Sequence, residues 1–225
     1  MIVICLEGCH GCGKSTLTSL FSKSGFMSLD EAFLSMPHYN CMSPQTMLME
    51  SIWIGNWFSR LLDHRVASGN GSSEEEVFIA DRSPFSAVCY AGDKGHLLDP
   101  VIRAQMEEVR DNAGIEIYSV HLEVEDETLW RRIQTRLVVE PGREELNEGE
   151  REHMDRIHGW YKAFDWDFVV DNTGEGGGEE VMAAILERVM LRSRKAREER
   201  EGGGDRKRGG ECGSPTSVAI EWTIE

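Results

Sequence analysis

The most informative segment of this 225-residue chain is Gly8-Cys9-His10-Gly11-Cys12-Gly13-Lys14-Ser15. It matches the pattern G-x-x-x-x-G-K-[ST] in full. The apolar, β-branched run Ile2–Glu7 comes directly before it and predicts a short buried strand. Residues 14–24 follow it and place apolar side chains at helical spacing, so they predict a helix. The order of strand, glycine-rich loop and helix predicts a phosphate-binding loop.

The residue types in this loop suit a triphosphate and a magnesium ion. Glycines allow the backbone to curl closely around phosphate oxygens, and the following helix directs the positive end of its dipole at them. Lys14 supplies a charge for the β- and γ-phosphates, and the Ser15 hydroxyl is placed to ligate Mg²⁺. We therefore predict ATP and Mg²⁺ as cofactors. The predicted nucleotide-binding residues are Gly8, Cys9, His10, Gly11, Cys12, Gly13, Lys14, Ser15 and Thr16.

Cys9 and Cys12 have the C-x-x-C spacing that is also found in zinc and redox sites. The sequence offers no second pair of ligands at metal spacing. The two cysteines occupy variable positions of the phosphate-binding loop, and we interpret them as parts of that loop.

Short apolar runs alternate with helical patterns along the rest of the chain. Further strands are predicted at 26–29, 77–80, 115–122 and 168–170. Helices are predicted at about 45–66, 84–91, 99–112, 125–137, 148–162 and from about 179. Strands that alternate with helices predict an α/β fold of three layers, a five-stranded parallel sheet with helices on both faces.

The composition changes after about Leu191. Residues 1–191 are predicted to form one domain, and 192–225 a charged, glycine-rich tail that is mostly disordered. Apolar and polar residues alternate near the end of the tail, which indicates a terminal strand at 217–224 or a segment that becomes ordered on binding.

The overall charge and hydropathy limit the class of partner. The formal net charge is −16, which argues against a nucleic-acid partner. About 40% of the residues are hydrophobic, enough for a sizeable core. No stretch approaches the ~20 apolar residues of a membrane span, and no signal peptide is visible. We expect a soluble cytoplasmic protein with reduced thiols, a small-molecule substrate and no membrane partner.

The end of the third strand distinguishes among proteins with this loop. It carries Asp81-Arg82-Ser83, and the chain has neither N-K-x-D nor D-x-x-G of GTPases. With Ser86 and Tyr90, this motif resembles that of the deoxynucleoside kinase and thymidylate kinase superfamily. Nucleoside kinases carry E-R-S there and thymidylate kinases D-R-Y or D-R-F, so this chain combines the two. The resemblance implies a P-loop kinase fold with an arginine-rich lid.

Three other stretches extend the resemblance over about residues 1–190. Asp30-Glu31-Ala32 ends the second strand, where nucleoside kinases carry E-P-V and thymidylate kinases R-E-P. Leu129–Arg136 together with Arg143 resembles the lid. Residues 153–161 resemble the helix that follows the lid in nucleoside kinases.

The resemblance implies a role for each motif. Glu31 is expected to accept the proton of the acceptor's 5′-hydroxyl group, with Asp30 as the rival base. Asp81 is expected to help hold Mg²⁺, and Arg82 to reach the acceptor's 5′ oxygen or phosphate.

Arg132 and Arg136 lie one helical turn apart, so both can face the same side. As lid arginines they are expected to neutralise charge on the transferred γ-phosphoryl group, with Arg143 as a further candidate. The alternative is a solvated charged face.

Recognition of the acceptor's base is expected on the long helix at 45–66. The resemblance aligns Glu50 with the glutamine that nucleoside kinases use, and Gln45 is the alternative. Trp53 and Trp57 lie nearby at helical spacing, where they either stack on a base or belong to the core.

These observations favour a kinase that transfers phosphate from ATP to a nucleoside. A nucleoside monophosphate kinase of the thymidylate type is the second hypothesis. The same motifs also fit a kinase of another small metabolite or of a polynucleotide end, and a non-catalytic ATP-binding interaction module. The resemblance also implies a homodimer.

Overall fold

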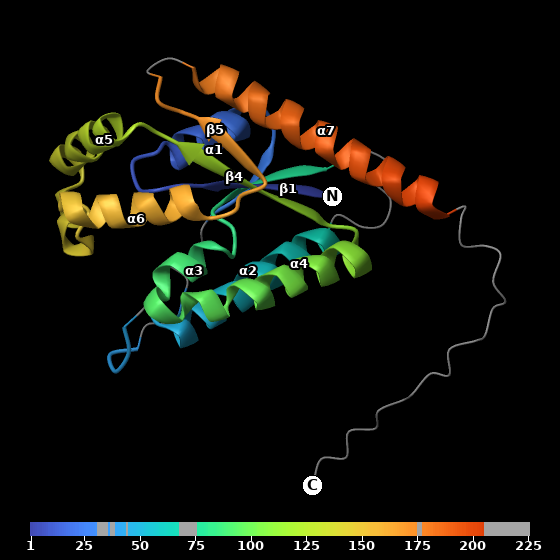
Figure 1. Cartoon of the computed structure of the whole chain (residues 1–225), viewed down its shortest axis with the longest axis horizontal. Coiled ribbons are helices and arrows are strands. Elements are labelled where there is room, and N and C mark those ends of the chain that lie inside the picture. Colours follow the sequence, from blue (N-terminus) through green and yellow to red (C-terminus); the bar gives the residue numbers. More distant parts are fainter. Residues whose placement is uncertain (31–35, 37–38, 44, 68–75, 175–176, 205–225) are drawn as a thin grey trace, which may run out of the picture. The chain divides into compact units, whose positions relative to one another are not determined.

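A parallel sheet of five strands forms the centre of residues 1–189 (Figure 1). The computed structural model describes residues 1–30, 36, 39–43, 45–67, 76–174 and 177–204. The strands are β1 (Ile2–Glu7), β2 (Met27–Leu29), β3 (Val77–Asp81), β4 (Glu116–Glu123) and β5 (Phe168–Asp171). Their order in the sheet is β2-β3-β1-β4-β5. This arrangement confirms the predicted parallel α/β fold.

Helices connect the strands and cover both faces of the sheet. The α-helices are α1 (Lys14–Lys23), α2 (Met47–Ala67), α3 (Ser86–Tyr90), α4 (Asp99–Ala113), α5 (Asp126–Val139), α6 (Arg151–Ala163) and α7 (Gly178–Gly204). Two 3₁₀ helices are η2 (Gly92–Leu97) and η3 (Pro141–Leu146). Figure 1 shows α2, α3 and α4 together on one side of the sheet and α1 on the other. The predicted three layers are therefore present.

The central strand β1 brings the sequence motifs together. All six of its residues are buried, because β3 and β4 flank it and helices cover both faces. Leu6 pairs with Asp81 of β3, and Glu7 pairs with His121 of β4. Since the strands are parallel, their carboxyl ends lie at the same edge of the sheet. The glycine-rich loop after β1 therefore begins beside the motif that ends β3.

Residues 192–204, which the sequence analysis assigned to a mostly disordered tail, belong to helix α7 in the structure. Helix α7 continues to Gly204, although the compact first unit ends at Val189. Residues 192–200 are mostly Arg, Lys, Glu and Ala, which have high helix propensity, so a helix that has already begun can continue without an apolar face. The predicted strand at 217–224 lies outside the described residues.

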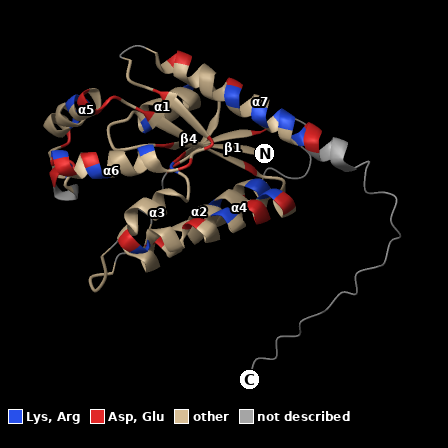
Figure 2. Cartoon of the chain, in the orientation of Figure 1, with Lys and Arg blue, Asp and Glu red and all other residues tan. Residues whose placement is uncertain are grey.

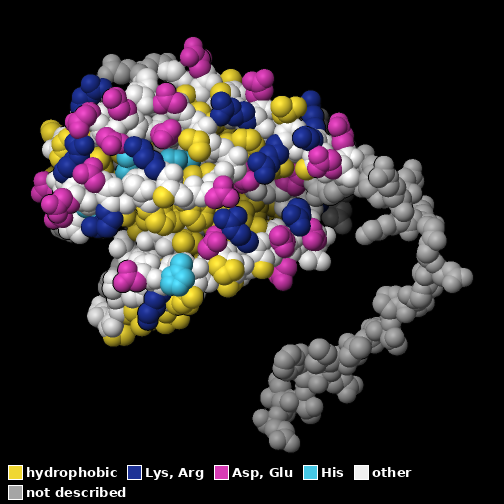
Figure 3. All heavy atoms as spheres, in the orientation of Figure 1, with side chains coloured by type: hydrophobic (Ala, Val, Ile, Leu, Met, Phe, Trp, Pro, Cys, Tyr) yellow, Lys and Arg dark blue, Asp and Glu magenta, His cyan; other side chains and the backbone are white. Residues whose placement is uncertain are grey.

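Charged side chains of both signs share the surface of the domain. Figure 2 shows basic residues interspersed with acidic ones along α4, and Figure 3 shows the same mixture around a band of hydrophobic side chains. Among the residues that the structure describes, no helix is both long and apolar enough to cross a lipid bilayer. The five cysteines in this part of the chain are free.

Candidate functional site

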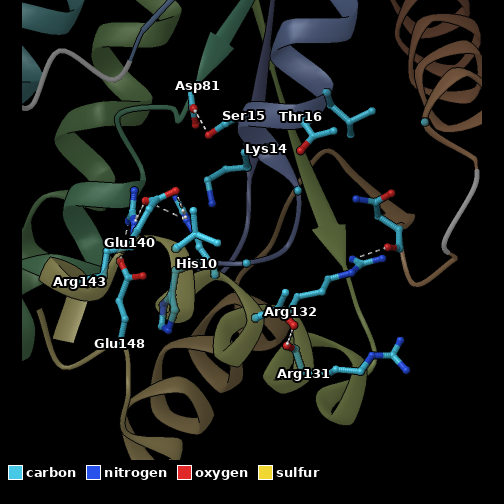
Figure 4. Close-up of a pocket in the computed structure, with 18 of the residues that line it drawn as sticks. His10, Lys14, Ser15, Thr16, Asp81, Arg131, Arg132, Glu140, Arg143 and Glu148 are labelled. Atoms are coloured by element: carbon cyan, nitrogen blue, oxygen red, sulfur yellow. Dashed lines mark hydrogen bonds and ion pairs between the residues drawn. The ribbon is translucent and has the colours of Figure 1, made fainter.

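A cavity of about 1060 Å³ lies over the glycine-rich loop (Figure 4). Its walls come from this loop, α1, the end of β3, α5, η3 and the segment after β5. The basic residues that line it are Lys14, Arg82, Arg131, Arg132, Arg136 and Arg143. The acidic ones are Asp30, Asp81, Glu140 and Glu148. The cavity therefore has an excess of positive charge, although the whole chain is strongly acidic.

The glycines of the loop hold conformations that other residues rarely adopt. Gly13 precedes α1 with φ 104°, and a Cβ atom there would lie 2.6 Å from Asn172 Nδ2. The Asn172 amide uses this approach to donate a hydrogen bond to the Cys12 carbonyl oxygen at 2.7 Å. Gly11, with φ 81°, lies against Ile133 of α5 at 2.8 Å from its would-be Cβ. The loop is therefore packed closely between α5 and the end of β5.

The ammonium group of Lys14 lies inside the loop. It donates hydrogen bonds to the carbonyl oxygens of Gly8 at 2.6 Å and Cys9 at 3.2 Å. The residue is 8% exposed. These contacts hold a buried positive charge at the centre of a loop that has the geometry for phosphate.

Two loop side chains remain neutral. Burial raises the pKa of the Cys9 thiol to about 12, so the thiol stays protonated. Burial also lowers the pKa of His10 to about 3. Cys9 Sγ and His10 Nδ1 lie 3.4 Å apart. In the described part of the chain no three His, Cys, Asp or Glu side chains gather in a way that would hold a metal.

The two predicted magnesium ligands lie together. Ser15 Oγ donates a hydrogen bond to Asp81 Oδ2 at 3.4 Å. The other carboxylate oxygen of Asp81 is buried and has no hydrogen-bond partner among the described residues. A hydroxyl and a carboxylate fit Mg²⁺, which prefers oxygen ligands and commonly takes only one or two from the protein.

Arg82 follows β3 in a left-handed conformation with φ 75°, which is unusual for a residue other than glycine. Its backbone N–H donates to Leu6 O at 3.1 Å. Its guanidinium donates to the Tyr161 hydroxyl at 3.0 Å and lies 5.2 Å from the centre of the Tyr90 ring. The strained backbone and these partners fix the arginine at the wall of the cavity.

The predicted lid arginines have different partners. Arg132 donates to the carbonyl oxygens of Asn172, Thr173 and Gly174 at 2.9 to 3.1 Å, so it braces the segment after β5. Arg136 pairs with Glu140 at 3.3 Å, and Arg143 pairs with the same carboxylate.

Residues 3–177 match the AAA domain family. The chain belongs to this family. No curated protein matches the chain. Two solved structures of deoxyadenosine kinase from M. mycoides are similar to this AAA domain, each at 18% identity. One, with dCMP and dCDP bound, has a TM-score of 0.53 over 84% of this chain and 99% of its own. The other, with dATP bound, has a TM-score of 0.47 over 84% and 98%. The family and the shared fold confirm the predicted P-loop kinase fold.

The residues predicted to recognise the acceptor's base do not line the cavity of this AAA domain. Glu50, Trp53 and Trp57 are buried on α2, and none of them lines the cavity. Trp57 Nε1 donates to the backbone oxygen of Arg82 at 3.3 Å. Burial raises the pKa of Glu50 to about 8, and the charge of Arg82 opposes this rise. Gln45, the alternative to Glu50, is exposed.

Of the two candidate bases, Asp30 is among the described residues and Glu31 is not. Asp30 lines the cavity and forms an ion pair with Arg60 at 2.6 Å.

One residue that supports the site, without lining the cavity, was not predicted from the sequence. Glu7, the last residue of β1, is fully buried. Its carboxylate accepts hydrogen bonds from the backbone N–H and the hydroxyl of Ser83, both at 2.7 Å, and from the Ser86 hydroxyl at 2.9 Å. It thereby joins the strand before the glycine-rich loop to the motif after β3. The sequence signal was an acidic residue at the end of an otherwise apolar strand.

Proposed function

We propose that this AAA domain transfers the γ-phosphoryl group of Mg-ATP to a nucleoside. The observation that carries the proposal is one cavity lined by Lys14, by the hydrogen-bonded pair Ser15 and Asp81, and by arginines of α5 and η3. Phosphoryl transfer depends mainly on positioning and on neutralising charge, and this cavity offers groups for both.

The donor half of the reaction belongs to the glycine-rich loop. Backbone N–H groups of the loop and Lys14 would bind the β- and γ-phosphates. Ser15 and Asp81 would hold the magnesium ion, which supplies neutralisation of phosphate charge when it is bound. Arg136 and Arg143 would contact the transferred group, and Arg132 would position the segment after β5 beside the loop.

The acceptor half rests on Arg82 and on the end of β2. Arg82 would bind the 5′ oxygen of the acceptor. Glu31 would accept the proton of the 5′-hydroxyl group as the oxygen attacks the γ-phosphorus, and Asp30 is the alternative base. Glu50, Trp53 and Trp57 stay proposals for the wall of the nucleoside site.

One observation favours a nucleoside over a nucleoside monophosphate as the acceptor. Asp30 places a carboxylate at the cavity, at the position where thymidylate kinases carry arginine. Because Asp30 is ion-paired with Arg60, the pair offers little net positive charge to the phosphate of a monophosphate acceptor.

A homodimer also stays a proposal. Large apolar side chains are exposed on α2 and α4, among them Leu48, Val66 and Val101. Light scattering on the full chain tests it, with twice the chain mass of 25.4 kDa as the expected result.

An acceptor panel tests the proposed function. ADP formation is measured with Mg-ATP and each of a set of nucleosides and nucleoside monophosphates, with an acceptor-free reaction as the control. We expect nucleoside-dependent ADP formation. Turnover with monophosphates alone would assign the chain to the thymidylate type, and turnover with no member of the panel would contradict a nucleoside or nucleotide kinase.

A further inference from the structure

The carboxylate of Glu140 binds two arginines of the cavity at once. Both of its oxygens lie 3.3 Å from Arg136 Nε, and its Oε2 also pairs with Arg143 Nε. A second acid, Glu148, accepts a hydrogen bond from the other end of the Arg143 guanidinium at 3.0 Å. All four residues line the cavity that contains the glycine-rich loop. Carboxylates of the chain therefore already pair with the arginines that line the cavity.

The backbone creates this arrangement. Helix α5 ends at Val139, and Glu140 leaves the helical conformation with φ −123° and ψ 67° before η3 begins. Arg136 is four residues before Glu140 and Arg143 is three residues after it. The corner at Glu140 brings the two arginines, which belong to different helices, to one carboxylate. Figure 4 shows Glu140, Arg143 and Glu148 grouped on one side of the cavity, away from Asp81 and Ser15.

The pairs are of a kind that a ligand can displace. The side chain of Glu140 is 47% exposed, and those of Arg136 and Arg143 are 32% and 31% exposed. Ion pairs with this much exposure contribute little to stability, because water screens them. A terminal phosphate carries more charge than a carboxylate and accepts several charge-assisted hydrogen bonds from guanidinium groups.

We propose that Glu140 is a positioning residue that holds Arg136 and Arg143 at the cavity wall and competes with the γ-phosphate of the nucleotide for them. The inference rests on the proposed function, since it takes a triphosphate as the ligand. The arginines pass from Glu140 to the γ-phosphate when ATP binds, and they return after the phosphoryl group has left. Glu140 thus weakens the binding of ATP, and it helps the two arginines to let go of the transferred phosphate after the reaction.

The substitution Glu140→Gln tests the inference, because it keeps the shape of the side chain and removes its charge. Binding of ATP and of ADP is measured by isothermal titration calorimetry with Mg²⁺ present. We expect Glu140→Gln to bind ATP about tenfold more tightly than the unaltered chain, since one repulsive charge is gone, Arg136 loses its carboxylate partner and Arg143 keeps only Glu148. The affinity for ADP, which has no γ-phosphate, should change less than about twofold.

The matched control is Asp155→Asn. Asp155 pairs with Arg151 on α6 at 3.1 Å and with the same four-residue spacing, and it does not line the cavity. This variant should bind both nucleotides as the unaltered chain does. Equal gains for ATP and ADP, or no gain for ATP in a Glu140→Gln protein with an unchanged melting temperature, would overturn the inference. If the unaltered chain binds ATP in this experiment, the proposed nucleotide site stands whatever Glu140→Gln does. If the unaltered chain binds no ATP, the proposed function is overturned as well.

Discussion

Ser15 Oγ donates a hydrogen bond to Asp81 Oδ2 across 3.4 Å, although 66 residues separate the two in the chain. Ser15 belongs to the first turn of α1, and Asp81 is the last residue of β3. The contact follows from the topology, because β1 and β3 are parallel neighbours and their carboxyl ends meet. It places a hydroxyl and a carboxylate beside Lys14, where a nucleotide would bring its magnesium ion.

Asp81→Asn should reduce kcat by about 100-fold or more, because an amide ligates Mg²⁺ much more weakly than a carboxylate. The Mg²⁺ concentration needed for half-maximal rate should rise in the same variant. Both are read from initial rates across a magnesium titration. Asp63→Asn, an exposed acid on α2, serves as the control. An unchanged magnesium requirement in Asp81→Asn would remove Asp81 from the metal site.

Glu7→Gln should lower the free energy of unfolding by about 2–4 kcal/mol, since an amide NH₂ group would face hydroxyl donors in a buried site. The residue is fully buried, and Ser83 and Ser86 both donate to it. Urea denaturation followed by circular dichroism measures the change. Glu123→Gln, at the end of the neighbouring strand β4, should change stability by less than about 0.5 kcal/mol. Equal effects of the two substitutions would contradict the account of Glu7.

Glu50 should make stability depend on pH. Burial raises its pKa from 4.5 to about 8, so the folded chain binds a proton that the unfolded chain releases. The contribution to stability is fully present below pH 4.5 and is lost as the pH rises through about 8. Glu50→Gln removes this dependence, so the melting temperature of the variant should exceed that of the unaltered chain more at about pH 9 than at about pH 5. A difference that stays constant with pH would show that Glu50 is ionised in the folded state.

Gly13→Ala should abolish ATP binding, because the residue has φ 104° and a Cβ atom would lie 2.6 Å from Asn172 Nδ2. Gly55→Ala is a control in which the same substitution should leave ATP binding intact and stabilise the fold. Gly55 lies inside α2 with open space around it, so alanine should raise stability by about 0.5–1 kcal/mol. Calorimetry with ATP and thermal melts measure the two effects. Normal ATP binding by Gly13→Ala would contradict the proposed role of the loop.

The sequence predicted the fold well, because the fold depends on local patterns, whereas the donor-side roles stay predictions. Apolar runs and helical spacing located all five strands and seven α-helices of the described chain, and the complete loop motif located Lys14 and Ser15. The sequence pointed to the lid arginines, but it did not predict the groups with which they pair. Glu140 and the carbonyl groups around Asn172 approach them only through the folded corner after α5 and the segment after β5.

The remaining features depend on tertiary context that a single sequence does not contain. The burial of Glu7 and its bonds to Ser83 come from the pairing of β1 with β3. The two tryptophans of α2 fit either a base-binding wall or a core by their spacing, and the structure buries both. The sequence pattern did not predict α7 beyond residue 191, because residues 192–200 lack an apolar face, although most of them have high helix propensity.

Transfer of label from γ-³²P-ATP to a nucleoside would demonstrate the proposed reaction itself. The unaltered chain should produce a labelled nucleoside 5′-monophosphate with at least one nucleoside, and Lys23→Ala, at the exposed end of α1, should do the same. Lys14→Ala should transfer no label, because its ammonium group is the charge held within the loop. The account would be contradicted if the unaltered chain labelled no nucleoside, or if Lys14→Ala labelled one at the same rate.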